Sequence, residues 1–150
     1  MKLHLLVAVA FLAACATAPQ PSTAPAARPA SFAKPSVMLR PIGAFACRPG
    51  GTAPLNLAVR ISNHAAEAVM VRTIRLTTPV GQAVSFEPSH HAVNTFLEAS
   101  QTDIIPVHIT AAVGAEVKRP YRAAHIRAEI EFETGGARFW ETFDLTDVQL

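Results

Sequence analysis

Residues 125–143, HIRAEIEFETGGARFWETF, show most clearly how this chain folds. Apolar and charged residues alternate on both sides of Gly135-Gly136, which predicts two half-buried strands joined by a tight turn. Two adjacent glycines suit a two-residue hairpin turn, because both can adopt a positive φ. The facing pairs in this register are Glu133 with Arg138 and Phe132 with Phe139. The first pair should be exposed and the second should pack in the core.

The same register places Glu141 in the inward-facing phase of the second strand. A charged side chain in that phase has two explanations. Either a β-bulge corrects the phase, or Glu141 lies at an edge of the fold where its carboxylate reaches solvent. The sequence leaves both explanations open.

The period of two recurs along most of residues 37–150, without a long apolar stripe of helical period. The best helical candidate, residues 89–98, lacks a clean apolar face. The pattern predicts about seven short strands. Antiparallel strands of this length and number predict an all-β chain folded as an antiparallel β-sandwich. The expected strands are approximately 38–46, 55–62, 68–77, 83–87, 102–110, 125–134 and 137–145. Their expected core side chains include Val59, Ile61, Val107, Ile130 and Phe132.

Two of these strands have irregular features. Within residues 68–77, Val69 and Val71 share one face whereas Ile74 and Leu76 share the other, which is typical of a strand that bends from one sheet to the other. Pro106 lies inside another strand and has no N–H to donate. It therefore predicts an edge position for that strand.

The run from Leu55 to His64, followed by Val69 to Ile74, resembles the second and third strands of immunoglobulin-like domains in bacterial envelope proteins. In both, a strand ends at an Asn, a polar turn follows, and a β-branched strand returns. The resemblance implies an immunoglobulin-like sandwich. It does not extend to antibody domains, because the chain has no Cys…Trp…Cys core and Trp140 lies in the last expected strand.

The N-terminus has the layout of a secretory signal. A short positive segment precedes the apolar run Leu5 to Leu12, which is too short to span a bilayer core of about 30 Å. The following residues, Leu12-Ala13-Ala14-Cys15, resemble the lipobox of bacterial lipoproteins. That resemblance implies cleavage between Ala14 and Cys15, a thioether-linked diacylglycerol on Cys15, and a palmitate-type acyl chain on its amine. The alternative is an ordinary signal peptide in which Cys15 is incidental.

Ala16 follows the cysteine, where lipoproteins kept in the inner membrane tend to have Asp. The resemblance therefore implies an outer-membrane lipid anchor that faces the periplasm. Residues 16–36 hold five prolines and seven alanines, a composition typical of a semi-rigid extended linker that does not fold. The expected organisation is a signal peptide at 1–14, the lipidated cysteine and linker at 15–36, and a β-sandwich domain at 37–150.

Composition excludes several classes of function. A chain of 150 residues is too short for a multidomain enzyme. A net charge of +2 is too small to indicate the basic surface of a nucleic-acid-binding domain. Two cysteines cannot build a disulfide-rich scaffold. No Ser-His-Asp spacing or phosphate-binding glycine loop is present. We therefore expect no catalysis, no cofactor and no small-molecule substrate.

Three groups of side chains remain as candidates for chemistry. Cys47 is either a small core residue or the donor of an intermolecular disulfide. No two histidines have the i, i+2 spacing that places both imidazoles on one strand face, but a loop could gather His90 and His91 with a Met or Cys to bind copper or zinc. The carboxylates of the last hairpin alternate onto a face that should be solvated. They are Glu129, Glu131, Glu133, Glu141, Asp144 and Asp147.

These observations predict a lipid-anchored periplasmic interaction module. It would serve cell-envelope or secretion-apparatus assembly by binding an envelope protein that the sequence does not identify. A sandwich offers edge strands for such binding, and the strand with Pro106 is the less suitable edge because it lacks one donor. The alternative is a periplasmic metal-handling protein that uses His90 and His91.

Overall fold

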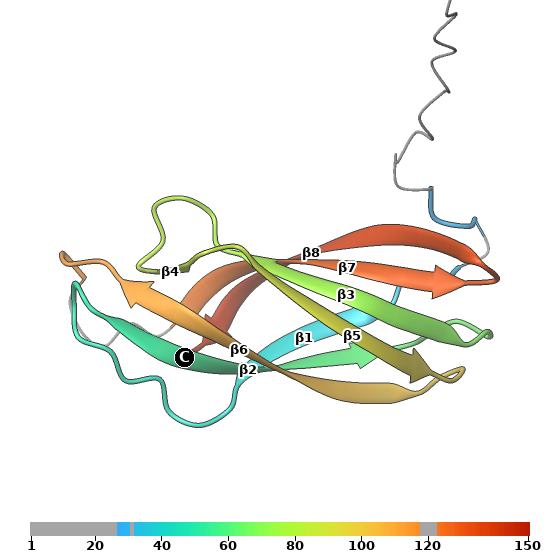
Figure 1. Cartoon of the computed structure of the whole chain (residues 1–150), viewed down its shortest axis with the longest axis horizontal. Helices are drawn as coiled ribbons and strands as arrows, with labels where there is room; N and C mark the ends of the chain where they lie inside the picture. Colours follow the sequence, from blue (N-terminus) through green and yellow to red (C-terminus); the bar gives the residue numbers. More distant parts are fainter. Residues whose placement is uncertain (1–26, 31, 118–122) are drawn as a thin grey trace, which may run out of the picture.

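Two four-stranded antiparallel sheets form the domain, in a computed structural model that describes residues 27–30, 32–117 and 123–150. The first sheet has the order β1-β2-β6-β4, and the second has the order β5-β3-β7-β8. The strands run along the long axis of the molecule (Figure 1). Their bounds are β1 Ser36–Pro41, β2 Thr52–Ser62, β3 Val69–Thr77, β4 Val84–Phe86, β5 Ser89–Leu97, β6 Thr102–Val113, β7 Ala123–Thr134 and β8 Ala137–Gln149.

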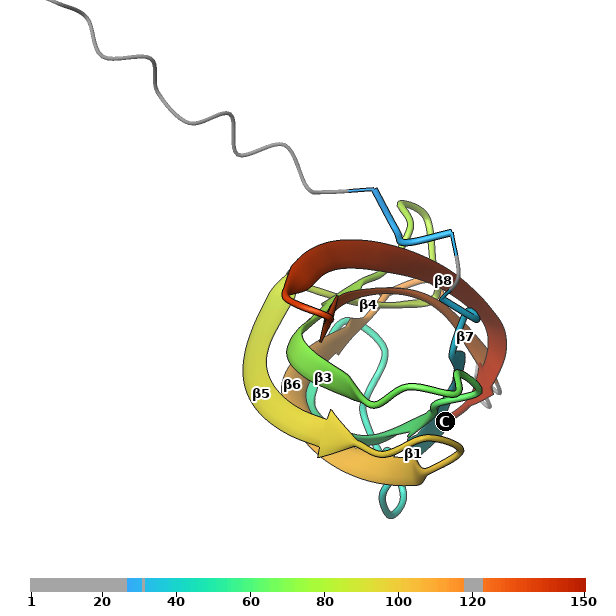
Figure 2. The same ribbon diagram turned by 90° about the vertical axis from the view of Figure 1, so that its right-hand side faces the viewer.

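The strand order is that of an immunoglobulin-like sandwich, as predicted. β1 pairs with β2 and β2 pairs with the later strand β6, whereas β3 pairs with β7 and β7 with β8. Seen along the long axis, the two sheets curve around one common interior (Figure 2). The side chains predicted to line this core are all buried, namely Val59, Ile61, Val107, Ile130 and Phe132.

The β7–β8 hairpin has the predicted register. Phe132 lies opposite Phe139 and Glu133 lies opposite Arg138. The two phenylalanine rings are buried with centroids 6.0 Å apart, and Arg138 Nε donates to Glu133 Oε2 at 2.8 Å on the outer face. The pairing continues without a shift through Ile130 and Glu141, and the bulge lies farther on, between Ala124 and Ile126. Glu141 is therefore an inward-phase residue at an edge, because β8 is the outermost strand of its sheet.

One strand was not predicted. Residues 89–97 form β5, which pairs with β3, so the described part of the chain has eight strands and the helical candidate at 89–98 is wrong. The inner side of β5 carries polar Ser, His and Thr as well as apolar Val93 and Leu97. The sequence of β5 therefore lacks the regular alternation of apolar and polar residues that identifies a half-buried strand. At the other end of the domain, β1 ends at Pro41 and not near residue 46.

The phase change in β3 comes from a β-bulge, and the expected change of sheet is wrong. The pairing of β3 shifts between Val71 and Thr73 against both of its neighbours, which leaves Arg72 as the irregular residue. One inserted residue turns the later side chains back to the first face. All four apolar residues of β3 consequently face the core: Val69, Val71, Ile74 and Leu76.

Pro106 lies beside an unpaired stretch of β6. The short strand β4 pairs only with Ala111–Val113, so no described strand covers the far edge of β6 at Pro106. Two backbone hydrogen bonds at the ends of the β2–β6 pair show which residues of β6 face β2. Asn63 N donates to Gln101 O, and Val113 N donates to Gly51 O. The N–H and C=O groups of odd-numbered residues in β6 therefore point to β2. In this register the backbone N of residue 106 points away from β2, to the open edge. A proline there costs no hydrogen bond of the ladder, as expected for an edge position.

The folded domain begins earlier than residue 37. Residues 28–30 and 32–35, here the N-terminal strap, pack against β8 at the end of the molecule where the β7–β8 hairpin turns (Figure 1). Phe32 is 6% exposed, and its ring meets Phe139 edge-on at 5.0 Å and Phe132 at 6.2 Å. The described residues of the expected linker, 28–30 and 32–36, therefore belong to the folded domain, because Phe32 completes the core.

Candidate interaction surfaces

The predicted lipidation site lies outside the described residues, since both Ala14 and Cys15 precede residue 27. The described residues are strands, turns and loops, and none of them forms a helix long and apolar enough to cross a membrane. The anchor therefore stays a prediction of the sequence.

His90 and His91 are adjacent on β5 and point to opposite faces, as the sequence predicts for an extended chain. His90 is on the outer face, where its Nδ1 accepts a hydrogen bond from Arg75 Nε at 3.3 Å. His91 faces inward beside Ile74. In residues 27–30, 32–117 and 123–150, no three His, Cys, Asp or Glu side chains are grouped as a metal site would need. The geometry thus offers the metal-handling alternative no assembled set of ligands.

His91 is nevertheless an unusual residue. Its Nε2 is buried and has no hydrogen-bond partner among the described residues. Burial lowers the pKa of His91 below its ordinary value of 6.5, and the neighbouring His108 and His90 lower it further. The folded domain therefore binds a proton at His91 less readily than the unfolded chain does.

This shift predicts a loss of stability in weak acid. As the pH falls below 6.5, the unfolded state takes up the proton first, so the free energy of unfolding decreases. His91→Gln should remove this part of the pH dependence, measured by urea denaturation between about pH 7.5 and 5. His64→Gln is the matched control, because His64 is exposed in the β2–β3 turn. Equal pH profiles for wild type and His91→Gln would contradict the expectation.

Cys47 is a core residue. It is 4% exposed, and its Sγ lies 3.5 Å from the carbonyl oxygen of Arg48. A thiol this buried is poorly placed for a bond to a second molecule. The structure favours the packing role over the intermolecular disulfide.

Two carboxylates of the last hairpin, those of Glu133 and Asp144, bind arginines on the outer face of the second sheet, whereas Glu141 faces inward and binds the strap. Glu133 accepts from Arg72 and Arg138, both at 2.8 Å, and these bonds lower the pKa of Glu133. Arg127 Nε donates to Asp144 at 2.8 Å and likewise lowers the pKa of Asp144. A general acid at neutral pH needs a raised pKa. These two groups are instead held in their charged form on a solvated face, as the sequence predicts.

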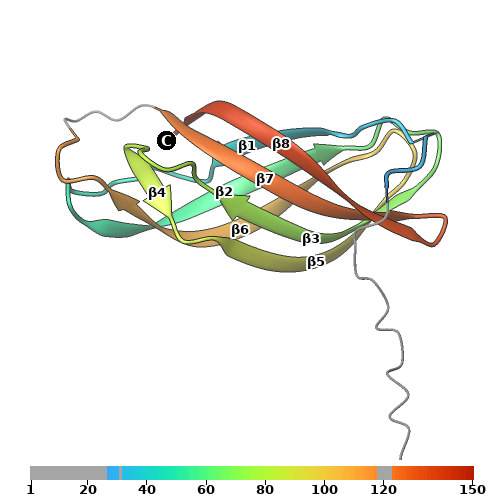
Figure 3. The same ribbon diagram turned by 90° about the horizontal axis from the view of Figure 1, so that it is seen from above.

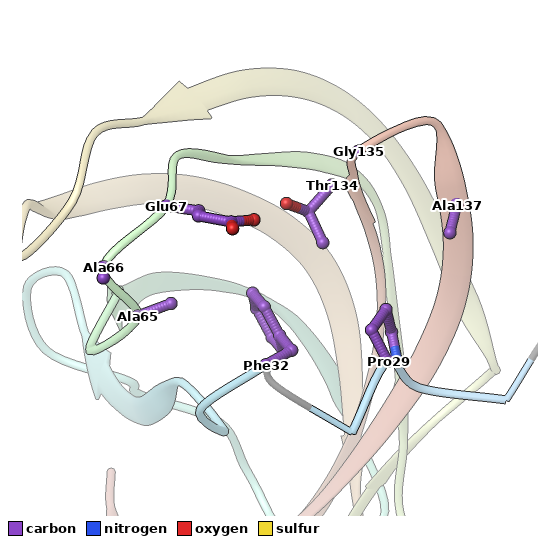
Figure 4. Close-up of a pocket in the computed structure, with 8 residues that line it drawn as sticks. All are labelled: Pro29, Phe32, Ala65, Ala66, Glu67, Thr134, Gly135 and Ala137. Atoms are coloured by element: carbon purple, nitrogen blue, oxygen red, sulfur yellow. The ribbon is translucent and has the colours of Figure 1, made fainter.

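A pocket of about 420 Å³ opens at the end of the molecule where the strap lies (Figure 4). Its lining residues come from the strap, the β2–β3 turn and the β7–β8 hairpin: Pro29, Phe32, Ala65, Ala66, Glu67, Thr134, Gly135 and Ala137. Most of this lining is apolar, and Glu67 is the one titratable side chain among the described residues that line it.

Most of the open sheet edges are modified in ways that hinder pairing with another chain. On β8, Lys34 of the strap donates to the Thr142 carbonyl at 3.1 Å and lies 3.3 Å from Glu141. On β5, Asn94 has a φ of 54° at the bulge opposite Arg72, which interrupts a regular edge. On β6, Pro106 removes one donor. Such features are how natural sheets avoid edge-to-edge association.

A further stretch of edge borders a groove, and there too Pro41 lacks an N–H and Asp147 has a positive φ of 59°. This groove of about 560 Å³ runs between β1 and the last part of β8. One wall is Val37–Pro41 and the other is Leu145–Gln149. We call it the β1–β8 groove; β1 and β8 lie side by side in Figure 3. It brings together two outermost strands that belong to different sheets.

Comparison with known proteins supports the fold and no more. No protein-family model and no curated protein matches the chain. Among solved structures, the chain is similar to the X-ray structure of Northeast Structural Genomics Consortium target SoR45, with 8% identity, 82% of this chain and 90% of that chain covered, and a TM-score of 0.53. It also aligns with the ASH / PapD-like domain of human CEP192 (PapD-like domain 7), with 14% identity, 88% and 98% covered, and a TM-score of 0.33. At these identities the first likeness concerns the sandwich fold alone.

The sequence did not indicate the strap or the groove. A lone Phe32 in a Pro- and Ala-rich segment was the one available signal for the strap. The groove depends on how the two sheets face each other, and no local pattern encodes that arrangement.

Proposed function

We propose that this chain is a lipid-anchored periplasmic module on the outer membrane that binds an envelope protein and performs no catalysis. The observation that carries the proposal is an immunoglobulin-like sandwich whose open edges converge in the β1–β8 groove. Strand edges are a common means of protein recognition. The lipobox-like Leu12-Ala13-Ala14-Cys15 supports the anchor, and the Pro- and Ala-rich segment after it supplies a spacer.

The anchor predicts a clear change of location. Cys15→Ala should block lipidation and move the protein from the membrane fraction to the soluble periplasmic fraction, because a thioether-linked diacylglycerol and an acyl chain hold a protein on a bilayer stably. Cys47→Ala is the matched control and should stay in the membrane fraction. Intact mass should show a lipidated chain that begins at Cys15. An unlipidated wild-type chain that begins elsewhere would overturn the anchor.

Binding itself is tested by crosslinking in intact cells, followed by purification of the chain. The expected result is one recurrent envelope protein that is absent when the strands are unfolded by a core substitution. The competing metal function is tested on protein purified without added metal. One copper or zinc per chain, with a melting temperature that falls on chelation, would replace the binding proposal.

A further inference from the structure

We propose that the outer face of the first sheet binds a partner protein whose surface combines apolar side chains with a carboxylate. This inference rests on the proposed function and gives it a contact surface and a chemistry. The surface, here the cationic face, lies across β1, β2 and β6, which are neighbours in one sheet (Figure 1). Its side chains are Met38, Arg40, Ala58, Arg60, Ile104 and Pro106.

The register of the three strands places these side chains in two adjacent rows. Met38 lies opposite Arg60, and Arg60 lies opposite Ile104. The next row is Arg40, Ala58 and Pro106. In all three strands the odd-numbered residues carry the buried core side chains, so the even-numbered side chains point outward. The six side chains therefore form one contiguous surface.

Apolar side chains are exposed on this face although they lie in regular strands. Met38 is 44% exposed and Ile104 is 59% exposed. Ile42, which follows β1 directly and still bonds through its N–H to Asn56, is also exposed. Within the described strands β1, β2 and β6, no outward position holds Lys, Asp or Glu. Exposed Met and Arg in a region depleted of those three residue types are typical of the centre of a protein–protein interface.

The two arginines of this face lack an internal counter-charge. Arg40 and Arg60 are both exposed and lie diagonally across the β1–β2 pair, which separates the two positions by about 7–8 Å. Neither is in an ion pair with a described residue. Asp103 instead accepts from the Ile104 N–H at 2.8 Å, and Asp147, across the β1–β8 groove, is in no ion pair in the described ranges. The two like charges therefore repel each other.

The outer face of the second sheet has the opposite arrangement. Each of its outward arginines is in an ion pair with a Glu or Asp of the same sheet. These arginines are Arg72, Arg75, Arg127 and Arg138. The chain thus neutralises the arginines of one outer face internally, whereas Arg40 and Arg60 on the other face are left to interact with a different molecule.

This charge pattern identifies the chemistry of the occupant. A carboxylate placed between Arg40 and Arg60 can accept charge-assisted hydrogen bonds from both guanidinium groups and offset their mutual repulsion. Met38 and Ile104 flank the two arginines. Covering them excludes water from the contact, which strengthens the attraction between the charges. The partner therefore carries an Asp or a Glu in an apolar surrounding.

Two other occupants fit the face less well. A second copy that docked by the same face would bring two further arginines against Arg40 and Arg60, and like charges disfavour such a contact. Lipid surfaces are bound by clusters of about four to eight Lys or Arg, whereas the outward positions of β1, β2 and β6 hold two. An acidic protein surface needs only one or two well-placed carboxylates.

Carbodiimide coupling tests the contact directly. Arg60→Lys keeps the positive charge and replaces the guanidinium, which does not couple, with an amine. In cells that make the full-length chain, a carbodiimide joins that amine to a carboxylate in contact with it as an amide, with loss of water. We expect mass spectrometry to find residue 60 bonded to an Asp or a Glu of one recurrent partner protein.

Ala92→Lys is the matched control, because Ala92 is exposed on the outer side of β5 in the second sheet. It should give no bond from residue 92 to another protein. An Arg60→Lys chain that bonds to no partner carboxylate, or that bonds no more often than Ala92→Lys does, overturns the proposal.

Charge reversal tests the affinity. Arg60→Glu should lower the yield of the partner crosslinked with formaldehyde at least about tenfold, because the partner carboxylate then meets a like charge. Arg48→Glu makes the same change of charge at an exposed loop position outside the face and should leave the yield unchanged. The melting temperature of Arg60→Glu should not fall, since the new carboxylate lies diagonal to Arg40. A marked fall would reveal an internal partner of Arg60 and overturn the proposal.

The remaining outcomes separate this face from other occupants and from the proposed function. Dimers, measured by sedimentation, that Arg60→Glu dissociates would make a second copy the occupant and overturn the proposal. Binding of the full-length Cys15→Ala chain to phosphatidylglycerol vesicles, lost in Arg60→Glu, would make it a lipid surface and overturn it too. If wild type and Arg60→Glu crosslink equally to a recurrent partner, only the cationic face is refuted. If wild type crosslinks to none, the proposed function fails as well.

Discussion

Phe132→Ala should lower the free energy of unfolding by about 3–5 kcal/mol, which is a large share of the roughly 5–15 kcal/mol typical of a domain. Phe132 is fully buried near the C-terminal end of β7. Its ring lies against Phe32 from the strap and Phe139 from β8. Truncation removes apolar contact with both and leaves a cavity that three separate segments would have to fill.

The measurement is urea denaturation of the two proteins under the same conditions. Phe96→Ala is the matched control, because Phe96 lies on β5 and is 52% exposed. Its truncation should change stability by no more than about 1 kcal/mol. A midpoint that Phe132→Ala leaves unchanged would mean that β7 is shifted by one residue, with Phe132 facing solvent.

Asn63→Ala should cost about 3 kcal/mol, although Asn63 is a polar residue at the end of a strand. Asn63 is 1% exposed, and its Nδ2 donates to the carbonyls of Glu67 and Glu98, each at 2.9 Å. Its Oδ1 accepts from the N–H of Ala65 at 3.0 Å. One side chain thereby ties the β2–β3 turn to the β5–β6 turn. Its removal leaves several main-chain groups without partners.

Asn63→Asp separates the two halves of this network. The carboxylate at position 63 can still accept a hydrogen bond from the N–H of Ala65. It has no N–H to donate to the carbonyl oxygens of Glu67 and Glu98, and its charge is repelled by them. We therefore expect Asn63→Asp to lower the free energy of unfolding at least as much as Asn63→Ala does. Asn56→Ala is the control, since Asn56 binds His108 at an exposed position. Thermal melting of all three variants gives the comparison. Equal melting temperatures for Asn63→Ala and Asn56→Ala would refute the bridging role.

Local patterns were sufficient for the hairpin and the core. The β7–β8 register follows from two adjacent glycines between strictly alternating runs, and the buried set on β2 and β6 follows from the same period. The chemistry of these elements lies within a few consecutive residues. Nothing distant has to be known to place Phe132 opposite Phe139.

The errors arose where one pattern has two structural solutions. The phase change in β3 fits a change of sheet or a bulge, and only the neighbouring strands show that Arg72 is the inserted residue. β5 escaped prediction because Ser89, His91 and Thr95 occupy its inner side. Glu141 had two explanations until the strap supplied Arg28 and Lys34, whose side chains lie 3.4 and 3.3 Å from its carboxylate.

The strap also determines how the domain bears mechanical load. A pull applied at residue 27 reaches the Arg28 contact with Glu141 first, then Phe32, then the Lys34 contact with Glu141, and only afterwards the ladder between β1 and β2. Two ion pairs and one aromatic ring yield at lower force than a strand sheared along its hydrogen bonds. Tension therefore detaches the strap while the sandwich is intact. The edge of β8 at residues 141–143 is then bare, and the groove that begins at Leu145 becomes longer under load.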